Sequence, residues 1–254
     1  MMALFSNTVT NCKRFSKALS QMRWINTGLL ILNRLLAKIS NQNICIYKYY
    51  LIAQPVNSKL LLPPNRGKNI EIRLINKQDP VTQIFPRPLS VIYNRFEQGA
   101  LCLAAFKDEK FIGFIWLILS PYQEDEVRAR FIPLPTSRAA WDFDVYIVPE
   151  HRLGFTFLRL WEEANQLLIK NGIQWSCSRI SAFNLNSLKS HAGFGTIILG
   201  QAIFFRVYNW QITFSSLHPY IHFSSHFNSF PKFYLNTQKL NNPLSSRKKG
   251  ITLE

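Results

Sequence analysis

Acidic residues are missing from the first part of the chain. Residues 1–70 contain 10 Lys and Arg and no Asp or Glu, whereas residues 71–202 carry 14 basic and 13 acidic side chains. Residues 203–254 add 6 basic residues and one acid. The net charge of +16 therefore belongs to the two ends, and the middle is nearly neutral. This distribution argues against a nucleic-acid reader, which would carry its basic patch on the folded core.

Long apolar runs and closely spaced cysteines are also missing. The longest clean apolar run in the basic N-terminal part is Leu29–Leu32, which Asn33 and Arg34 end. It is far shorter than the roughly 20 residues that a membrane-spanning helix needs, and no clear secretory cleavage site follows it. The four cysteines are widely spaced without a CxxC pair. We therefore predict no metal site and no disulfide framework, but reduced thiols in a cytoplasmic protein.

Residues 12–40 have the periodicity of a basic, apolar helix. We predict that one helical face packs on the folded domain; its residues are Ile25, Leu29, Leu32, Leu36 and Ile39. Two alternatives stay open. The segment fits an interfacial helix on an anionic membrane surface, because it is rich in cations and free of acids. It also has the composition of a mitochondrial-type presequence.

The middle of the chain predicts the order strand, loop, helix, strand, helix. Trp141–Val148 alternates and is rich in aromatic and β-branched residues, as strands are, and Pro149 ends it. Phe155–Lys170 has apolar residues at helical spacing. Ile173–Phe183 predicts a second strand, and Asn184 can cap a short helix after it.

The part before this stretch predicts a helix followed by a hairpin. Leu89–Gln98 has helical spacing, and Ala100–Lys107 and Phe111–Leu119 predict two antiparallel strands joined by a short turn. Gly113 lies inside the second of these strands. A glycine there indicates a bulge or a close approach of another backbone.

Two motifs in the middle of the chain carry a family resemblance. They are Val148-Pro149-Glu150-His151-Arg152 and Asn184-x-x-Ser187-x-x-x-His191-x-x-x-Gly195. The first resembles the entry into the cofactor loop of the GNAT acyltransferases, the family related to Gcn5 N-acetyltransferases. The second is similar to that family's N-x-x-[AS]-x-x-x-Y-x-x-x-G, with His in the place of Tyr. The resemblance covers roughly residues 70–214.

The resemblance implies a fold and an activity. The fold is α/β (α+β), a GNAT-like acyl-CoA N-acyltransferase fold with a mixed central sheet flanked by helices and an N-terminal helix-strand extension. The activity is N-acyl transfer, most simply N-acetyl transfer. The donor is acyl-CoA (acetyl-CoA or another acyl thioester), and the acceptor is an unknown amine. The runner-up is a non-catalytic GNAT-fold thioester-binding or scaffold protein, held on a membrane surface by its basic N-terminal helix.

The resemblance also implies the donor site. Strand 141–148 would part from strand 173–183, so that the pantetheine arm binds backbone groups of Tyr146, Ile147 and Val148. The loop would wrap the pyrophosphate at the start of the next helix. Its residues are His151, Arg152, Leu153, Gly154 and Phe155, and Asn184 and Ser187 complete the implied donor contacts. The family loop is R-x-x-G-x-[GA], whereas this chain has Arg152-Leu153-Gly154-Phe155-Thr156-Phe157, with one Gly displaced by one place.

Three residues are candidates for the chemistry. His191 takes the place of the tyrosine that protonates the leaving thiolate, and we expect it to titrate near neutrality. Asp142 and Asp144 are two apart on a strand, so they should share one face, where one can be the base for the amine. The alternative is that both are ion-pair partners of Arg128, Arg130 or Arg179.

Composition divides the chain into three parts. We expect an extension of a basic helix and a strand over residues 1–69, a GNAT-like domain over residues 70–214, and a basic tail rich in Ser and Asn over residues 215–254. The family resemblance also implies that the polar loop before Trp141 borders the acceptor; the alternative is a solvated loop held by its own ion pairs. Its charged residues are Glu124, Asp125, Glu126, Arg128 and Arg130.

Overall fold

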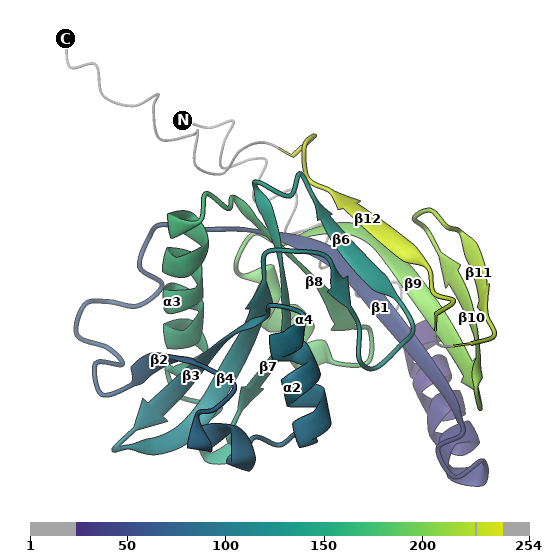
Figure 1. Cartoon of the computed structure of the whole chain (residues 1–254), viewed down its shortest axis with the longest axis horizontal. Helices are drawn as coiled ribbons and strands as arrows, with labels where there is room; N and C mark the ends of the chain where they lie inside the picture. Colours follow the sequence, from purple (N-terminus) through teal and green to yellow (C-terminus); the bar gives the residue numbers. More distant parts are fainter. Residues whose placement is uncertain (1–23, 227, 241–254) are drawn as a thin grey trace. The chain divides into compact units, whose positions relative to one another are not determined.

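The computed structural model describes residues 24–226 and 228–240, which form two compact units interleaved along the chain (Figure 1). The described residues of the first unit are 24–55, 123–132, 177–226 and 228–236, and those of the second unit are 56–122, 133–176 and 237–240. Each unit combines strands with helices, so the predicted mixed α/β class is confirmed. The division into three parts along the chain stays a prediction.

The first unit is built on a sheet in the order β11-β10-β9-β1-β8. Strand β9 pairs antiparallel with both β1 and β10, and β10 pairs antiparallel with β11. The bounds of these strands are Ile44–Pro55 for β1, Trp175–Ser181 for β8, Ile197–Val207 for β9, Trp210–Ser215 for β10 and Ile221–Ser224 for β11. Strands β6 (Arg130–Leu134) and β12 (Lys232–Asn236) are neighbours in a smaller sheet whose third strand is β5 (Tyr122–Gln123). Strands β11 and β12 therefore give regular structure to part of the predicted tail.

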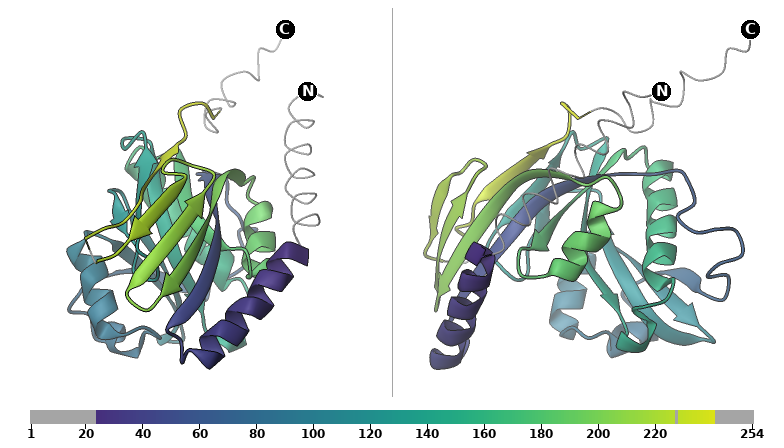
Figure 2. Two further views of the ribbon diagram at one scale, coloured as in Figure 1. Left: turned by 90° about the vertical axis from the view of Figure 1, so that its right-hand side faces the viewer. Right: turned by 180° about the vertical axis from the view of Figure 1, so that it is seen from behind.

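Two helices pack on the sheet of the first unit. Helix α4 (Leu185–Ala192) buries Leu188 against Tyr50 of β1 and Ile180 of β8. The second helix spans residues 24–39 and lies along β1 (Figure 2). Asn26 donates to the Tyr50 hydroxyl at 3.2 Å, and Asn33 accepts the N–H of Ile46 at 2.7 Å.

The helix at residues 24–39 packs with a face that overlaps the predicted one only in part, because Leu29 and Leu36 are half-buried. Asn26 and Ala37 are buried, whereas Ile25, Leu32 and Ile39 of the predicted face are exposed. Two asparagines fix this rotation, because each makes a hydrogen bond with β1 that apolar periodicity cannot reveal. The predicted packing of Ile25, Leu32 and Ile39 on the domain is therefore wrong. Residues 12–23 of the predicted segment lie outside the described residues.

The second unit is an antiparallel sheet in the order β2-β3-β4-β7 with helices on both faces (Figures 1 and 2). The strands are β2 (Glu71–Ile75), β3 (Leu101–Lys107), β4 (Lys110–Ile118) and β7 (Ala139–Ile147). The helices are α2 (Leu89–Glu97), α3 (Thr156–Lys170) and the short η1 (Pro80–Ile84) and η2 (Pro149–His151). Helix α3 buries Leu160, Trp161, Ala164 and Leu168, and each fully buried large side chain contributes about 2 kcal/mol. The predicted helix, hairpin and strand–loop–helix segments are confirmed.

Strand β7 carries one extra residue relative to its partner β4. Phe143 pairs with Trp116 and Tyr146 pairs with Phe114, so two residues of β7 lie opposite Ile115 alone. Asp144, the first of the two, has φ 49°, in the left-handed region. This arrangement is a β-bulge, which interrupts the alternation of side chains between the two faces of the strand.

Gly113 lies where the backbones of β4 and β7 come closest. A Cβ atom at this position would be 2.6 Å from the carbonyl oxygen of Tyr146. The predicted close approach of another backbone is therefore confirmed. Among the residues that the structure describes, no helix is long and apolar enough to cross a membrane.

We predict that Gly113→Ala destabilises the protein by roughly 1–3 kcal/mol, because the added methyl group meets a backbone oxygen that cannot move alone. Chemical denaturation of the purified protein measures this change. The control is Gly28→Ala in the helix at residues 24–39, where an added Cβ has no atom within 4 Å. The control should be neutral or stabilising by up to about 1 kcal/mol. Equal stability of the two variants would contradict the close approach.

Candidate functional site

The predicted donor loop follows strand β7 in the second unit. The N–H of Val148 donates to the carbonyl oxygen of Ile112 at 3.0 Å, and Ile147 pairs with Gly113 of β4. The backbone edge that faces β4 is thus occupied as far as Val148. An extended donor arm can reach the backbone of Tyr146–Val148 only along the other edge of β7.

The loop leads into helix α3, whose N-terminus is not capped by any side chain that the structure describes. Helix α3 begins at Thr156 with Phe155 as its N-cap, and within the described part of the chain no side-chain hydrogen bond caps it. Its first turn contains no acid. The first N–H groups of a helix have no intrahelical partner and carry the positive end of the helix dipole. A diphosphate group fits such a terminus.

Basic side chains lie beside this helix terminus. The Nε of Arg152 donates to the carbonyl oxygen of Ile147 at 3.0 Å, which ties an exposed guanidinium to the loop. The guanidinium of Arg66 lies 5.7 Å from the ring centre of Phe155. Arg66 comes from the Pro-rich loop before β2, and nothing in its sequence context predicted it. The two cations and the open helix N-terminus together suit a phosphorylated donor.

The glycine of this loop is not required by sterics. The N–H of Gly154 donates to the carbonyl oxygen of His151 at 3.3 Å, and a Cβ atom on Gly154 would be at an ordinary 3.4 Å from the same oxygen. The loop is therefore a compact run of turns. Its side chains at Leu153 and Phe155 are exposed. The structure thus brings together Tyr146, Ile147 and Val148 and the loop residues 151–155 in one continuous segment.

The second motif lies on helix α4 in the first unit. The Asn184 side chain accepts the N–H of Ser187 at 3.1 Å, so the predicted N-cap is confirmed. The implied donor contacts of Asn184 and Ser187 stay predictions. Strand β7 belongs to the second unit and the greater part of β8 to the first, so the predicted gap between these strands also stays a prediction.

His191 is buried and neutral. Its Nδ1 lies 2.9 Å from Oε1 of Gln54, and Phe194 meets its ring edge-on. Because Oε1 is an acceptor, the proton of the neutral imidazole is on Nδ1. Burial lowers the pKa of His191 from 6.5 to about 4. The expectation that His191 titrates near neutrality is therefore wrong, and a charged imidazolium is not the form present at pH 7.

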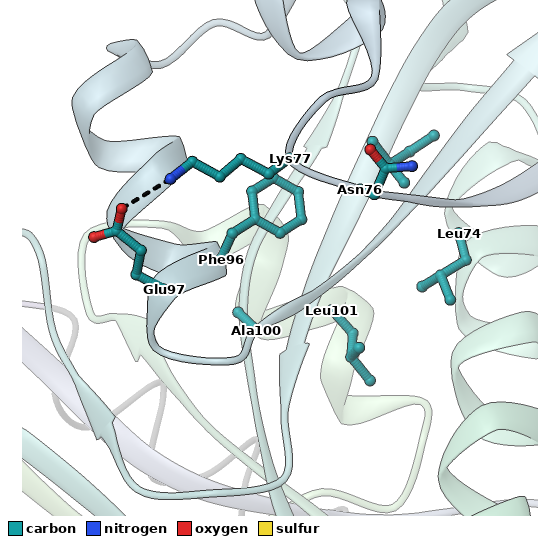
Figure 3. Close-up of a pocket in the computed structure, with 8 residues that line it drawn as sticks. Leu74, Asn76, Lys77, Phe96, Glu97, Ala100 and Leu101 are labelled. Carbon is teal, nitrogen blue, oxygen red and sulfur yellow. Dashed lines mark hydrogen bonds and ion pairs between the residues drawn. The ribbon is translucent and has the colours of Figure 1, made fainter.

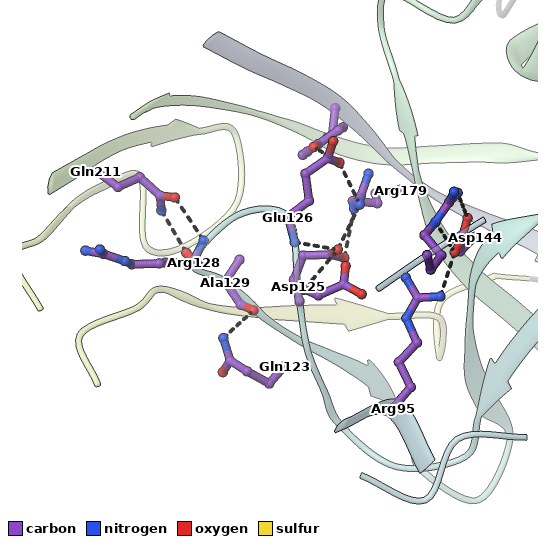
Figure 4. A network of polar contacts seen from close by, with 12 residues as sticks. Arg95, Gln123, Asp125, Glu126, Arg128, Ala129, Asp144, Arg179 and Gln211 are labelled. Atoms are coloured by element: carbon purple, nitrogen blue, oxygen red, sulfur yellow. Dashed lines mark hydrogen bonds and ion pairs between the residues drawn. The ribbon is translucent and has the colours of Figure 1, made fainter. Parts of the chain in front are cut away.

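Asp142 and Asp144 take different partners. Asp142 is buried and accepts the hydroxyl of Ser176 at 2.6 Å. Asp144 pairs with Arg87 and with the buried Arg95, whose Nη1 lies 2.6 Å from Oδ2 (Figure 4).

The bulge in β7 explains why the two carboxylates part. The guanidinium of Arg95 lies over the ring of Phe143, at 5.2 Å from its centre, so Asp144 and Phe143 reach the same cation. Adjacent residues of a regular strand would point to opposite faces. The expectation that Asp142 and Asp144 share a face is therefore wrong. Asp144 pairs with Arg87 and Arg95, which are not the predicted arginines, and the role of either aspartate as base stays a prediction.

An ion network lies beneath the loop Gln123–Arg128 in the first unit (Figure 4). Arg179 of β8 binds the buried Glu124 through two hydrogen bonds of 2.8 Å and contacts Glu126 at 2.9 Å. The Tyr49 hydroxyl donates to Glu126 at 2.6 Å, and the guanidinium of Arg179 lies 4.3 Å from the ring centre of Tyr49. Burial alone would raise the pKa of Glu124, but the Arg179 charge and its hydrogen bonds outweigh it and lower that pKa.

A cavity of about 500 Å³ adjoins this network. Its lining includes Asp125, Glu126 and Arg128 of the loop, Gln42 and Asn43 before β1, and Arg206 of β9. The second carboxylate oxygen of Glu126 has no hydrogen bond within the described residues, and Glu126 is partly exposed. The cavity therefore offers a carboxylate to a cationic or amine-bearing molecule.

The second unit has a cavity of its own, of about 540 Å³ (Figure 3). Leu74, Phe96 and Leu101 line it together with Lys77 and Glu97, which form an ion pair of 2.8 Å. None of the predicted site residues lines this cavity. In the described part of the chain, no group of three His, Cys, Asp or Glu side chains could hold a metal ion.

No protein-family model and no curated protein sequence matches the chain. Among solved structures, it is similar to a tandem GNAT protein from the clavulanic acid biosynthesis pathway, with 12% identity, a TM-score of 0.45, and coverage of 67% of this chain and 54% of that one. It is also similar to a GNAT-family protein of Novosphingobium aromaticivorans described as an acetyltransferase, with 11% identity, a TM-score of 0.43, and coverage of 63% and 65%. A third similar structure is an aminoglycoside acetyltransferase from an uncultured soil metagenomic sample, with 11% identity, a TM-score of 0.38, and coverage of 50% and 88%.

Two of these structures are described as GNAT proteins, the family that the two sequence motifs resemble. The chain spans less than two thirds of the length of both.

We predict that the neutral His191 makes stability depend on pH. The pKa is about 4 in the folded state and near 6.5 in the unfolded state. As the pH falls through this window, the unfolded chain takes up a proton that the folded chain does not. The free energy of unfolding should then fall, by at most about 3 kcal/mol. Denaturant titrations at pH values between about 7 and 4 measure the slope.

The control for this slope is His191→Asn, whose amide N–H can replace Nδ1 as the donor to Gln54. This variant lacks the titrating group, so its stability should fall less steeply across the same pH range. The comparison uses slopes, because the smaller side chain also lowers stability at every pH. Equal slopes in both proteins would show that burial does not lower the pKa of His191.

We predict a structural role for Asp144. Asp144→Asn should destabilise the protein by about 3 kcal/mol, because it leaves the buried Arg95 without its carboxylate. Thermal or denaturant unfolding measures the change. Glu97→Gln is the control, since it removes an exposed ion pair with Lys77 and should leave the unfolding midpoint nearly unchanged. Unchanged stability of Asp144→Asn together with a loss of activity would point to the base role instead.

Proposed function

We propose that the chain is an N-acyltransferase that moves an acyl group, most simply acetyl, from acyl-CoA to an amine. The observation that carries the proposal is the uncapped N-terminus of α3, placed directly after β7 by the loop 148–155. This arrangement and the two sequence motifs support the same activity. A cytoplasmic location goes with this proposal.

The donor contacts follow from the second unit. The N–H groups at the start of α3 bind the diphosphate, with Arg152 and Arg66 as nearby cations. The backbone of Tyr146–Val148 binds the pantetheine arm along its edge away from β4. His151, Leu153, Gly154 and Phe155 shape the loop between these contacts. Asn184 and Ser187 of α4 are proposed as further donor contacts.

The acyl transfer needs few side chains that act as acid or base. The uncharged amine nitrogen attacks the thioester carbonyl carbon, the C–N bond forms, the C–S bond breaks, and the sulfur leaves as a thiolate. The nitrogen gives up its extra proton to water, which balances the proton that the thiolate takes up. A thiolate of an ordinary thiol, with a pKa near 8.5, leaves readily and can take its proton from water. The neutral His191 is therefore not needed as an acid. Positioning of the two reactants can supply a large part of the rate enhancement.

The amine must be uncharged when it attacks. Glu126 is the proposed group that receives the acceptor, because its carboxylate lines the cavity of the first unit and Tyr49 and Arg179 hold it in place. Asp125 adds a second negative charge to the same lining. Because Arg128 and Arg206 line the same cavity, we propose that the amine nitrogen of the acceptor binds at Glu126, with no charge class assigned to the rest of that molecule. Catalytic roles for Asp142 and Asp144 remain proposals that their buried partners do not favour.

A second candidate function is a non-catalytic, membrane-associated thioester-binding protein. The observation that favours it is the exposure of apolar side chains on the helix at residues 24–39, including Ile25 and Ile39. An amphipathic helix with its apolar side open can lie on an anionic membrane surface. This candidate binds the donor but does not turn it over.

We predict amine-dependent release of free thiol from acetyl-CoA when a panel of amines is offered. Arg152→Ala should raise the KM for acetyl-CoA about fivefold, since an exposed pair of opposite charges contributes up to about 1 kcal/mol. A continuous thiol assay measures both quantities. Arg138→Ala is the control, because it removes an exposed cation of the same unit outside the donor loop. Its KM should equal that of the unmodified protein.

Two results would count against the proposal. Tight binding of acetyl-CoA without thiol release for any amine would support the non-catalytic candidate. Equal effects of Arg152→Ala and Arg138→Ala on KM would show that the loop 151–155 does not hold the donor.

A further inference from the structure

Strand β10 exposes its apolar residues and buries its polar ones, the reverse of the usual pattern for a strand with one buried face. Its sequence Trp-Gln-Ile-Thr-Phe-Ser alternates, and the polar Gln211 and Thr213 are the buried residues. Gln211 is fully used there: it accepts the N–H of Arg128, and it donates to the Arg128 carbonyl oxygen and to the Thr213 hydroxyl. The hydrogen bonds of Gln211 therefore fix the register in which the apolar residues of the strand face outward.

The neighbouring strands continue this outward apolar surface. Ile212 lies between Phe205 of β9 and Phe223 of β11, and Phe214 lies between Ile203 and Ile221. We call the exposed part of this surface the open face; its residues are Val207, Trp210, Ile212, Phe214, Ile221 and Phe223. Ile221 is 67% exposed, Trp210 59% and Phe223 53%. Single exposed apolar residues are ordinary, but a contiguous set of this kind marks a surface that binds something.

The helix at residues 24–39 flanks the open face. Ile46 of β1 is aligned with Phe205 and Ile212, and Tyr50, four residues along β1, points to the same side of the sheet. Asn26 of the helix bonds to Tyr50, so the helix covers the β1 part of this side. Figure 2 shows the helix running along β1 with β9, β10 and β11 beside it.

The helix adds exposed apolar residues of its own next to the open face. They include Trp24, Ile25, Leu32, Leu35 and Ile39. Two aromatic residues with a polar edge, Trp24 and Trp210, are thus exposed, which is the residue type enriched where proteins meet membranes.

Charge decides between the occupants of this surface. In the described part of the first unit, the only acids are Glu124, Asp125 and Glu126, in the loop that Arg179 neutralises in part. The helix at residues 24–39 and strands β9, β10 and β11 contain none. The exposed cations of the helix are Arg34 and Lys38. An apolar surface whose flanking helix carries exposed cations and no acid complements anionic lipid headgroups.

A second copy of the chain fits this border less well. In two copies packed open face to open face, the helix and strands of either copy would supply no acid to pair with the helix cations of the other. Like charges brought together across an interface oppose association.

We propose that the open face and the exposed side of the helix at residues 24–39 form one docking surface for an anionic lipid bilayer. The apolar side chains enter the headgroup boundary, and the cations of the helix attract the surface. The two elements are held to one sheet, so they approach the membrane together. This inference does not depend on acyl transfer.

Vesicle flotation of the full chain tests the proposal. The protein should bind vesicles of phosphatidylcholine mixed with phosphatidylserine, bind pure phosphatidylcholine far less, and detach as salt is raised. The variant Ile221→Thr/Phe223→Thr keeps β-branched or strand-compatible residues on β11 and removes two open-face contacts. It should weaken binding to the anionic vesicles at least tenfold. Leu74→Thr is the matched control, since Leu74 is an exposed strand residue of the second unit, and its binding should be unchanged.

Other results overturn the proposal. Light scattering that shows a dimer, made monomeric by Ile221→Thr/Phe223→Thr and without vesicle binding, would assign the open face to a second copy. A monomer that binds no vesicles would leave the surface without a lipid role. Binding that survives the double variant but is lost on removal of residues 1–23 would assign the membrane contact to those residues. The thiol-release assay, which the double variant should not change, separates this outcome from failure of the proposed acyl transfer.

Discussion

The bulge in β7 is the constraint on which the candidate donor segment depends. By adding one residue opposite Ile115, it turns Asp144 onto the side of Phe143, where the buried Arg95 needs a carboxylate. The ion pair ties β7 to α2, and the strand then continues in register with β4 as far as the start of the loop. The same residues also explain why Gly113 must lack a side chain, because β4 and β7 come into close contact just beyond the bulge. A local irregularity of one residue therefore sets both the packing of the sheet and the point from which the donor loop departs.

Elements with a strong periodic signal were predictable, and the side-chain environments within them were not. Helix α3 follows from the apolar spacing of its own residues, and the close backbone approach at β4 is marked by its glycine. Both signals are local, so the sequence alone identified both features. The directions of Asp142 and Asp144 depended on a bulge in β7, a strand that itself contains no glycine, and Gly113 of β4 does not tell which residues of β7 are bulged. The packed face of the helix at residues 24–39 depended on two asparagines that bond to β1. A scale that rewards only apolar periodicity places those residues on the wrong side.

His191 shows the same limit for a candidate catalytic residue. The motif spacing located it correctly on α4, yet its chemistry is set by Gln54, which is 137 positions away in the sequence. Burial favours the neutral ring, and the amide oxygen of Gln54 fixes the proton on Nδ1. A motif therefore states where a side chain lies along the chain but not its protonation state. The function is better argued from the open helix terminus, whose unpaired N–H groups are a property of the backbone and survive the departure from the family's loop pattern.

Strand β10 buries polar residues and exposes apolar ones, which indicates that its exposed face is covered by a partner. A buried glutamine with every hydrogen bond made, on a strand whose isoleucine and aromatic residues are exposed, is a costly arrangement for a surface that stays in water. A register shifted by one residue would bury Trp210, Ile212 and Phe214, and the pairing with β9 and β11 fixes the other choice along the whole strand. This register leaves apolar side chains in water and so lowers the stability of the protein. Another apolar phase that covers the open face would recover that stability. The absence of acids from the helix and strands that carry the surface makes an anionic bilayer the phase that matches both its apolar and its charged parts.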